Sequence, residues 1–214
     1  GVSDLPVSRL EDREILVDGY RGRLYVNPSP ELRAEFMRLV REERELEEGL
    51  RTLALDPAVT RDGHPVPVMA NSGLLADIRP SLKSGAEGVG LYRTEVPFII
   101  RDRFPGEEEQ VEIYRQILAS FDPMPVTLRT LDVGGDKPLD YVDLPVEANP
   151  FLGTRGVRLG LSERRLLTTQ LRAGLRVAAD HPLELMVPMV GTLAKIAAVR
   201  ALVTETIATL RAEG

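Results

Sequence analysis

Two arginines that end apolar, strand-like runs are the residues of this sequence best placed for chemistry. Arg93 follows the run GVGLY and Arg129 follows PVTL, and an acid stands within three residues of each arginine. A guanidinium group stays charged at neutral pH, so a partly buried one needs a bound anion or a carboxylate partner. Because its fork matches phosphate and carboxylate oxygens, the pattern predicts a pocket for a small anion that carries several charges.

Further residues extend this predicted pocket. Arg155 lies in the segment NPFLGTRGVRLG and supplies a third guanidinium group. Gly134 and Gly135 allow the backbone to approach a ligand closely, and Lys137 adds another cation. The carboxyl ends of parallel strands are where ligands gather in open sheets and in barrels. The arginines therefore stand where an α/β fold binds its ligand.

The acids near the arginines allow two other interpretations. Arg93 could pair with Glu95 or Asp132 in an internal ion network, and the residue pattern favours neither this network nor the anion pocket. Glu95, Asp132 and Asp136 could also hold a metal ion. Mg²⁺ takes one or two carboxylates together with substrate oxygens, and the spacing does not demand such a site. Orientation of the arginines is the favoured role for these acids.

Other candidate sites are weaker. His64 and His181 each precede a proline at the start of an expected strand, which favours a turn role over catalysis. The glycines of GAEGVG precede a strand, whereas the loop that binds a dinucleotide follows one.

Composition narrows the class of protein. The chain has 214 residues, a formal net charge of −6 and no cysteine. The negative charge argues against nucleic acid as a partner, and the lack of cysteine is compatible with the cytoplasm. No apolar run approaches the roughly 20 residues of a membrane span, so no membrane partner is expected. The first residue is glycine and a helical pattern continues to the last residues, which favours a piece of a longer protein.

Periodicity predicts an α/β fold. A hairpin is expected over EILVDGY and GRLYVNP, followed by a charged amphipathic helix from Glu31 to about Leu53. Strand and helix then alternate about four times, which indicates parallel strands joined by crossover helices. Such units form either a small open sheet or half of an eight-stranded barrel. The expected strands are Val66–Ala70, Val89–Arg93, Val126–Arg129 and Leu185–Pro188. Three later helices are expected, over 107–121, over 162–180 with Ser162 as the cap, and over 192–214 with Thr192 as the cap.

Three motifs carry a family resemblance. GAEGVGLYRTE, RTLDVGGDK and NPFLGTRGVRL, in this order and spacing, closely resemble enzyme I of the phosphoenolpyruvate-dependent phosphotransferase system. FPGEEEQVEIYRQIL and LMVPMV agree with the same family, and the resemblance covers nearly the whole chain. Single motifs also resemble pyruvate phosphate dikinases and phosphoenolpyruvate synthases. PVTLRTLDVGGDK and YRTEVPF are most similar to the nitrogen-related branch of enzyme I, and the branch that serves sugar transport stays open as the alternative.

The resemblance implies a fold and a division into domains. It implies that 57–214 form the first half of a (β/α)8 barrel of the phosphoenolpyruvate-binding kind. It further implies that 29–56 form a linker helix and that 1–28 end a swivelling phosphohistidine domain. Arg93 and Arg129 match the arginines that grip the phosphate of phosphoenolpyruvate, and Arg155 matches a third arginine beside them.

The resemblance also implies a reaction that this chain does not complete alone. The phosphorylated histidine and the acid/base cysteine of the family lie outside the motifs found here, so no catalytic residue is expected within the chain. The Mg²⁺ ligands are expected beyond residue 214. The full-length protein would be a homodimeric, cytoplasmic enzyme that passes the phosphoryl group to a histidine phosphocarrier protein. The alternatives are a half-barrel that binds anions or assembles without catalysis, and part of a related dikinase.

Overall fold

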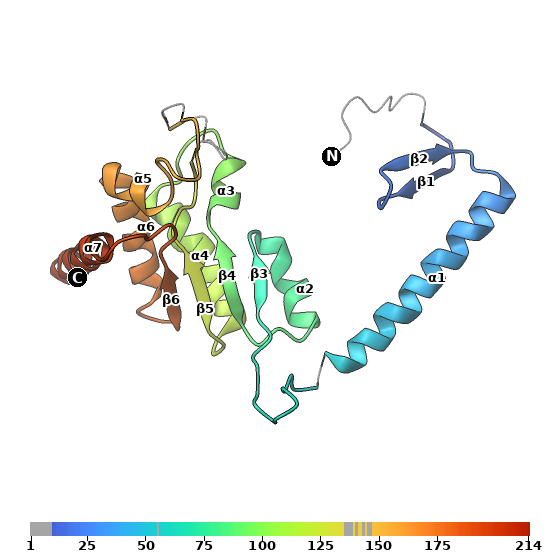
Figure 1. Cartoon of the computed structure of the whole chain (residues 1–214), viewed down its shortest axis with the longest axis horizontal. Coiled ribbons are helices and arrows are strands. Elements are labelled where there is room, and N and C mark those ends of the chain that lie inside the picture. Colours follow the sequence, from blue (N-terminus) through green and yellow to red (C-terminus); the bar gives the residue numbers. More distant parts are fainter. Residues whose placement is uncertain (1–9, 55, 135–138, 140, 143, 145–146) are drawn as a thin grey trace. The chain divides into compact units, whose positions relative to one another are not determined.

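The computed structural model describes residues 10–54, 56–134, 139, 141–142, 144 and 147–214. The chain divides into two units, Gly1–Asp56 and Pro57–Gly214 (Figure 1). Their elements differ in kind, because the first contains a hairpin and a helix and the second contains a parallel sheet with its covering helices.

The first unit consists of a hairpin and one long helix. Strands β1 (Ile15–Asp18) and β2 (Arg23–Val26) pair antiparallel, and helix α1 covers Pro30–Leu53. The Ser29 side chain caps α1 by accepting a hydrogen bond from the backbone N–H of Leu32, and proline occupies the first helical turn. The predicted hairpin and helix are confirmed. No residue of α1 is buried, so its apolar stripe is largely exposed in this unit.

The second unit is built on four parallel strands in chain order. β3 (Ala70–Ser72), β4 (Val89–Arg93), β5 (Val126–Arg129) and β6 (Leu183–Met186) lie side by side in that order (Figure 1). The predicted parallel arrangement is confirmed, and the bounds of β4 and β5 are as predicted. The other two strands are shifted from their expected positions.

The shifts have local causes. Val66 donates a backbone hydrogen bond to Ala58, within a small loop closed by the bridge between Val59 and Pro65, so the residues expected to open β3 pair elsewhere. β6 begins at Leu183 and ends at Met186, before the proline at 188, which lacks the N–H that a strand would donate.

Crossover helices follow the strands. α4 (Glu107–Phe121) matches the predicted helix, and three glutamates occupy its first turn, where the helix dipole favours negative charge. α7 (Leu193–Glu213) is capped by Thr192 as predicted. The predicted helix over 162–180 is two helices, α5 (Val157–Ser162) and α6 (Arg164–Val177). Ser162 is therefore not a cap, and its hydroxyl donates to the Leu159 carbonyl within α5.

The remaining helices are short. A single 3₁₀ turn, η2 (Leu75–Asp77), leads into α2 (Ile78–Lys83). α3 (Glu95–Ile99) follows β4 directly, and no periodic pattern predicted so short a helix. Among the described residues, no helix combines the length and the apolar character needed to cross a membrane.

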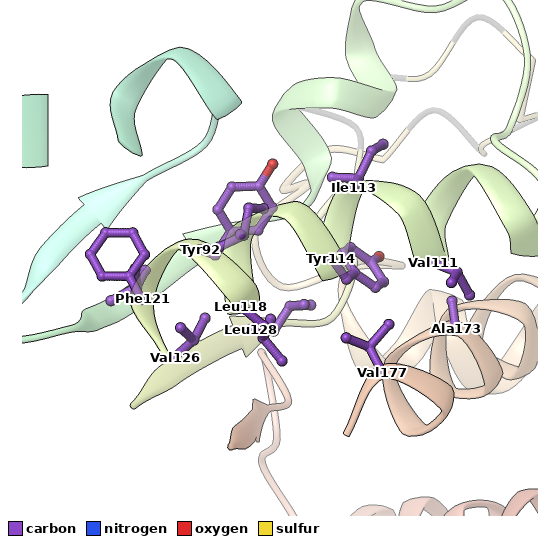
Figure 2. Packing of buried hydrophobic residues seen from close by; sticks show 12 residues of the cluster. Tyr92, Val111, Ile113, Tyr114, Leu118, Phe121, Val126, Leu128, Ala173 and Val177 are labelled. Carbon is purple, nitrogen blue, oxygen red and sulfur yellow. The ribbon is translucent and has the colours of Figure 1, made fainter. Parts of the chain in front are cut away.

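One hydrophobic core joins the sheet to its helices. Figure 2 shows side chains of α4 and α6 meeting Tyr92, Val126 and Leu128 of the strands. Ile78 of α2 and Leu185 of β6 pack against the same cluster. Because successive side chains of a strand point to opposite faces, these contacts place α2, α4 and α6 on one face of the sheet. The arginines that end β4 and β5 project from the opposite face.

The core position of Leu128 gives a test of the sheet. Its side chain is fully buried, so Leu128→Ala should lower the free energy of unfolding by about 2–5 kcal/mol through lost burial and a residual cavity. Leu193→Ala is the matched control, because Leu193 is 84% exposed and its truncation should change stability by less than about 0.5 kcal/mol. Urea denaturation followed by circular dichroism measures both values. Equal losses would mean that Leu128 does not lie in the core.

Candidate anion-binding site

The ends of β4 and β5 bring two arginines together. Arg93 and Arg129 are Cα partners in the parallel ladder, and each is the last residue of its strand. The neighbouring Thr94 side chain secures the two ends by donating a hydrogen bond to the Arg129 carbonyl at 2.8 Å. The predicted placement of two guanidinium groups at the carboxyl edge of one sheet is therefore present.

Two buried carboxylates hold Arg129. Nη2 pairs with Glu95 of α3, and Nη1 lies 3.0 Å from Oδ2 of Asp132. Glu95 opens α3, whose Phe98 is anchored in a second apolar cluster with Val133 and others. Glu95 and Asp132 are almost completely buried, so their charges would be costly without cationic partners. The acids therefore orient the arginine, as the sequence favoured.

Arg155 is fastened to the same aspartate. Its Nε lies 3.0 Å from Oδ1 of Asp132 and its Nη2 lies 3.3 Å from Oδ2, the two-pronged geometry that arginine favours with carboxylates. The guanidinium carbon also lies 4.7 Å from the centre of the Phe151 ring. Asp132 thus bridges Arg129 and Arg155, and the three side chains form one unit.

Glycines make this close approach possible. Gly156 has a φ of +55°, and a Cβ there would lie 2.9 Å from Cγ of Met189 and 3.3 Å from Oδ1 of Asp132. A Cβ on Gly134 would lie 2.8 Å from Cβ of Arg155. Both positions therefore exclude larger side chains, and the loop that carries Arg155 can lie directly on the end of β5.

The arginines retain donors for a ligand. Nε of Arg93 and Nε of Arg129 are buried atoms without a hydrogen-bond partner among the described residues. An unsatisfied buried donor is costly, and an anion with several oxygens would satisfy such donors.

The structure resolves part of the choice between ion network and anion pocket. The ion pairs of Glu95 and Asp132 within the described residues join them to Arg129 and Arg155, not to Arg93 as the network interpretation had it. An ion network is therefore present among the described residues, and the anion pocket stays a prediction, for which the Nε atoms of Arg93 and Arg129 remain available. Three other residues singled out from the sequence, Gly135, Asp136 and Lys137, lie outside the described residues.

Asp77 orders the loop after β3 on the other side of Arg93. Its Oδ2 accepts hydrogen bonds from the Ser72 hydroxyl and from the backbone N–H groups of Gly73 and Leu74, at 3.0 to 3.2 Å. The Gly73 N–H bond, the Leu74 and Ser72 bonds and the charge of Arg93 hold the pKa of Asp77 below its usual value, against the opposing effect of burial. The loop after β3 is therefore held in place beside Arg93.

The sequence interpretation missed two positioning residues. Asp77 ends the 3₁₀ turn η2, in a segment where the sequence motifs singled out no residue. Gln170 of α6 is buried and binds Thr94 and the Leu131 backbone, which belong to segments far away in the chain. A polar residue on the apolar face of a helix was the available signal for Gln170.

The histidines lie in turns, as predicted. His64 belongs to a turn in which its backbone N–H donates to the Thr60 hydroxyl oxygen at 3.0 Å. His181 follows α6, and its Nδ1 lies 3.3 Å from Oδ2 of Asp122.

Two acids considered as metal ligands have other partners. The described residues contain no group of three or more histidine, cysteine, aspartate or glutamate side chains that could hold a metal ion. Glu95 and Asp132, the acids considered for that role, take arginines as partners. These two carboxylates therefore serve to orient guanidinium groups.

Comparison with known families gives this site a context. Residues 47–214 match the family described as "PEP-utilising enzyme, PEP-binding domain". The chain is 44% identical over 202 residues to the "Phosphoenolpyruvate-dependent phosphotransferase system" protein of Escherichia coli strain K12, an alignment that covers 94% of this chain and 27% of that protein.

Two further relatives carry the name "Phosphoenolpyruvate-protein phosphotransferase". The protein of Staphylococcus carnosus strain TM300 is 43% identical over 200 residues, and that of Haemophilus influenzae is 41% identical over 204 residues. Each alignment covers 94% of this chain and 35% of the relative. The chain thus spans about a third or less of the length of the curated relatives it matches.

The hydrogen bonds of Asp77 predict a pH effect. Because its folded pKa is lowered, the carboxylate stabilises the fold fully above the unfolded pKa of about 3.9, and this stabilisation is lost as the pH falls through the folded pKa. Asp77→Asn should cost about 1 kcal/mol at pH 7, the difference between charged and neutral hydrogen bonds. Urea unfolding of both proteins between pH 7 and pH 3 should show this gap narrowing below about pH 4.

Asp180→Asn is the control for this measurement, because Asp180 is exposed. It should change stability little at any pH. A gap for Asp77→Asn that stays constant down to pH 3 would contradict the role of its charge.

Proposed function

Because the chain belongs to the phosphoenolpyruvate-utilising enzymes, through their phosphoenolpyruvate-binding domain, we propose that it supplies the substrate-binding arginines of a phosphoenolpyruvate-protein phosphotransferase. The full-length protein would take the phosphoryl group of phosphoenolpyruvate onto its own histidine and pass it to a histidine phosphocarrier protein. The names of the relatives support this reaction over a non-catalytic half-barrel or a dikinase.

One observation carries the proposal: Nε of Arg93 and Nε of Arg129, at adjacent strand ends, are buried donors without a hydrogen-bond partner among the described residues. A phosphate group has several oxygens around one centre, so a single phosphate can accept from both donors. Arg155 would assist through Asp132, which it shares with Arg129. Donors on positively charged guanidinium groups match an anionic ligand better than a neutral one.

The arginines would act by charge and position. In the transfer, the bond between phosphorus and the enol oxygen breaks while a bond from phosphorus to the histidine nitrogen forms, and the enolate leaves and is protonated to pyruvate. The transition state spreads negative charge over the phosphoryl oxygens. Guanidinium groups that are already oriented by Glu95 and Asp132 stabilise this charge without having to reorganise.

We extend the proposal to a (β/α)8 barrel. The strands follow chain order, and α2, α4 and α6 pack against the same face of the sheet. A doubly wound sheet carries helices on both faces, whereas a barrel carries them on the outside. The opposite face bears Thr127, whose hydroxyl donates to Glu184 at 2.8 Å, and such polar side chains would line the barrel interior. Further strands would close the sheet at β3 and β6.

The proposed domains follow the family. Residues 1–28 would end the phosphohistidine domain, 29–56 would form the linker helix, and 57–214 would form the first half of the barrel. Mg²⁺ would be held by ligands from other parts of the full-length protein. We further propose that the full-length protein is a homodimer in the cytoplasm and that it acts in the nitrogen-related branch, with sugar transport as the alternative.

Replacing the fork of Arg129 tests the function. In the full-length protein, Arg129→Lys keeps the charge but loses the planar fork that reaches Glu95, Asp132 and the phosphate together. The rate constant kcat/KM for autophosphorylation by phosphoenolpyruvate should fall by about 100-fold or more, as it does when one oriented donor is removed elsewhere. Incorporation of radioactive phosphate from labelled phosphoenolpyruvate measures the rate.

Arg115→Lys is the matched control, because Arg115 lies on α4 with its side chain 47% exposed and 3.7 Å from Glu112. Its kcat/KM should stay unchanged. Normal autophosphorylation of Arg129→Lys would remove this arginine from the phosphate clamp.

A further inference from the structure

A buried chain of neutral hydrogen bonds lies behind the arginine site. Gln170 of α6 accepts a hydrogen bond from the Leu131 backbone N–H at 2.7 Å through its amide oxygen. Its amide nitrogen donates to the Thr94 hydroxyl oxygen and to the Tyr114 hydroxyl oxygen, both at 3.0 Å. One side chain therefore uses its oxygen and both of its N–H groups inside the protein.

The direction of every bond in this chain is fixed. The Leu131 N–H can only donate, so it sets the orientation of the Gln170 amide. Thr94, which receives one amide hydrogen, donates its own to the Arg129 carbonyl at 2.8 Å. Tyr114 receives the other and donates to the Gln110 amide oxygen at 3.0 Å. Each group donates and accepts without conflict.

This series of hydrogen bonds reaches the backbone segments that follow Arg93 and Arg129. Thr94 directly follows Arg93, and Leu131 is two residues after Arg129. Gln170 therefore holds the backbone just beyond both guanidinium-bearing residues, from a helix on the opposite face of the sheet. Gln170 and Thr94 are almost fully shielded from water, so no solvent can replace these bonds.

We propose that Gln170 is a positioning residue for the phosphate clamp, which sets the relative position of Arg93 and Arg129 through Thr94 and Leu131. This inference rests on the proposed function, since it concerns the same site. A neutral amide suits the task because it fixes the backbone without contributing a charge that would pair with the arginines. An error of about 1 Å in the placement of binding groups can cost on the order of 100-fold in rate.

The test compares two buried glutamines, Gln170 and Gln110, in the full-length protein to which residues 1–214 belong. Gln170→Met keeps the size of the side chain but removes its bonds to Thr94 and Leu131. Gln110→Met is the matched control, because Gln110 is also buried and also bonds to Tyr114, whereas its other bond goes to the Pro105 carbonyl and not to a strand end. Urea midpoints of both variants show how far each destabilises the fold.

The binding readouts separate positioning from stability. Gln170→Met should lower kcat/KM for phosphoenolpyruvate by about 10- to 100-fold, mainly through KM, and should weaken calorimetric binding of inorganic phosphate about 10-fold. Gln110→Met should keep both values within about threefold, because it touches neither strand end. Equal losses in the two variants, or unchanged phosphate affinity in Gln170→Met, would overturn the inference.

If Gln170→Met does not fold, a second variant tests the same inference. Thr94→Val removes the hydroxyl that joins Gln170 to the Arg129 carbonyl, and it should weaken phosphate binding in the same direction. Unaltered phosphate affinity in Thr94→Val would then overturn the inference.

The unmodified protein distinguishes this inference from the proposed function. If it binds phosphate but takes no phosphoryl group from phosphoenolpyruvate, the proposed function fails, and the phosphate affinities of the variants still test Gln170. If it binds no phosphate, both proposals fail.

Discussion

The pairing of Arg93 with Arg129 across β4 and β5 is the constraint on which the rest of the site depends. Neighbouring strands lie about 4.8 Å apart, so two permanent positive charges are forced into one small region. Glu95 and Asp132 offset the repulsion, and Asp132 also takes Arg155. Nε of Arg93 and Nε of Arg129 still have no hydrogen-bond partner among the described residues, and such buried cationic donors suit an anion.

Charged and neutral side chains have different roles at this site. The carboxylates orient the guanidinium groups directly, and they are tolerated in the interior only because each has a cationic partner. The amide of Gln170 and the hydroxyl of Thr94 fix the backbone that carries the arginines. Because these two groups carry no charge, they fix the backbone at the strand ends without weakening the attraction between the arginines and an anionic ligand.

The sequence predicted those elements whose signals are local. β4 and β5 are apolar runs typical of strands. α1 and α4 have helical periodicity, with a cap or acids at their starts. The bounds of all four elements lie within a residue of the expectation. The shift of β3 depends on the pairing of Val66 with Ala58, which no local pattern encodes. The same reason explains the site: the arginine positions were predictable from strand ends, whereas Gln170 binds residues 39 and 76 positions away in the chain.

Arginine side-chain nuclear magnetic resonance tests the central claim most directly. In the full-length protein with ¹⁵N-labelled arginine, Arg93→Lys and Arg129→Lys each remove one Nε–H resonance and so assign the two donors. Both resonances should shift downfield together on titration with phosphoenolpyruvate, because each buried Nε–H gains a phosphate oxygen as acceptor. Saturating phosphoenolpyruvate that leaves both resonances in place would contradict the account.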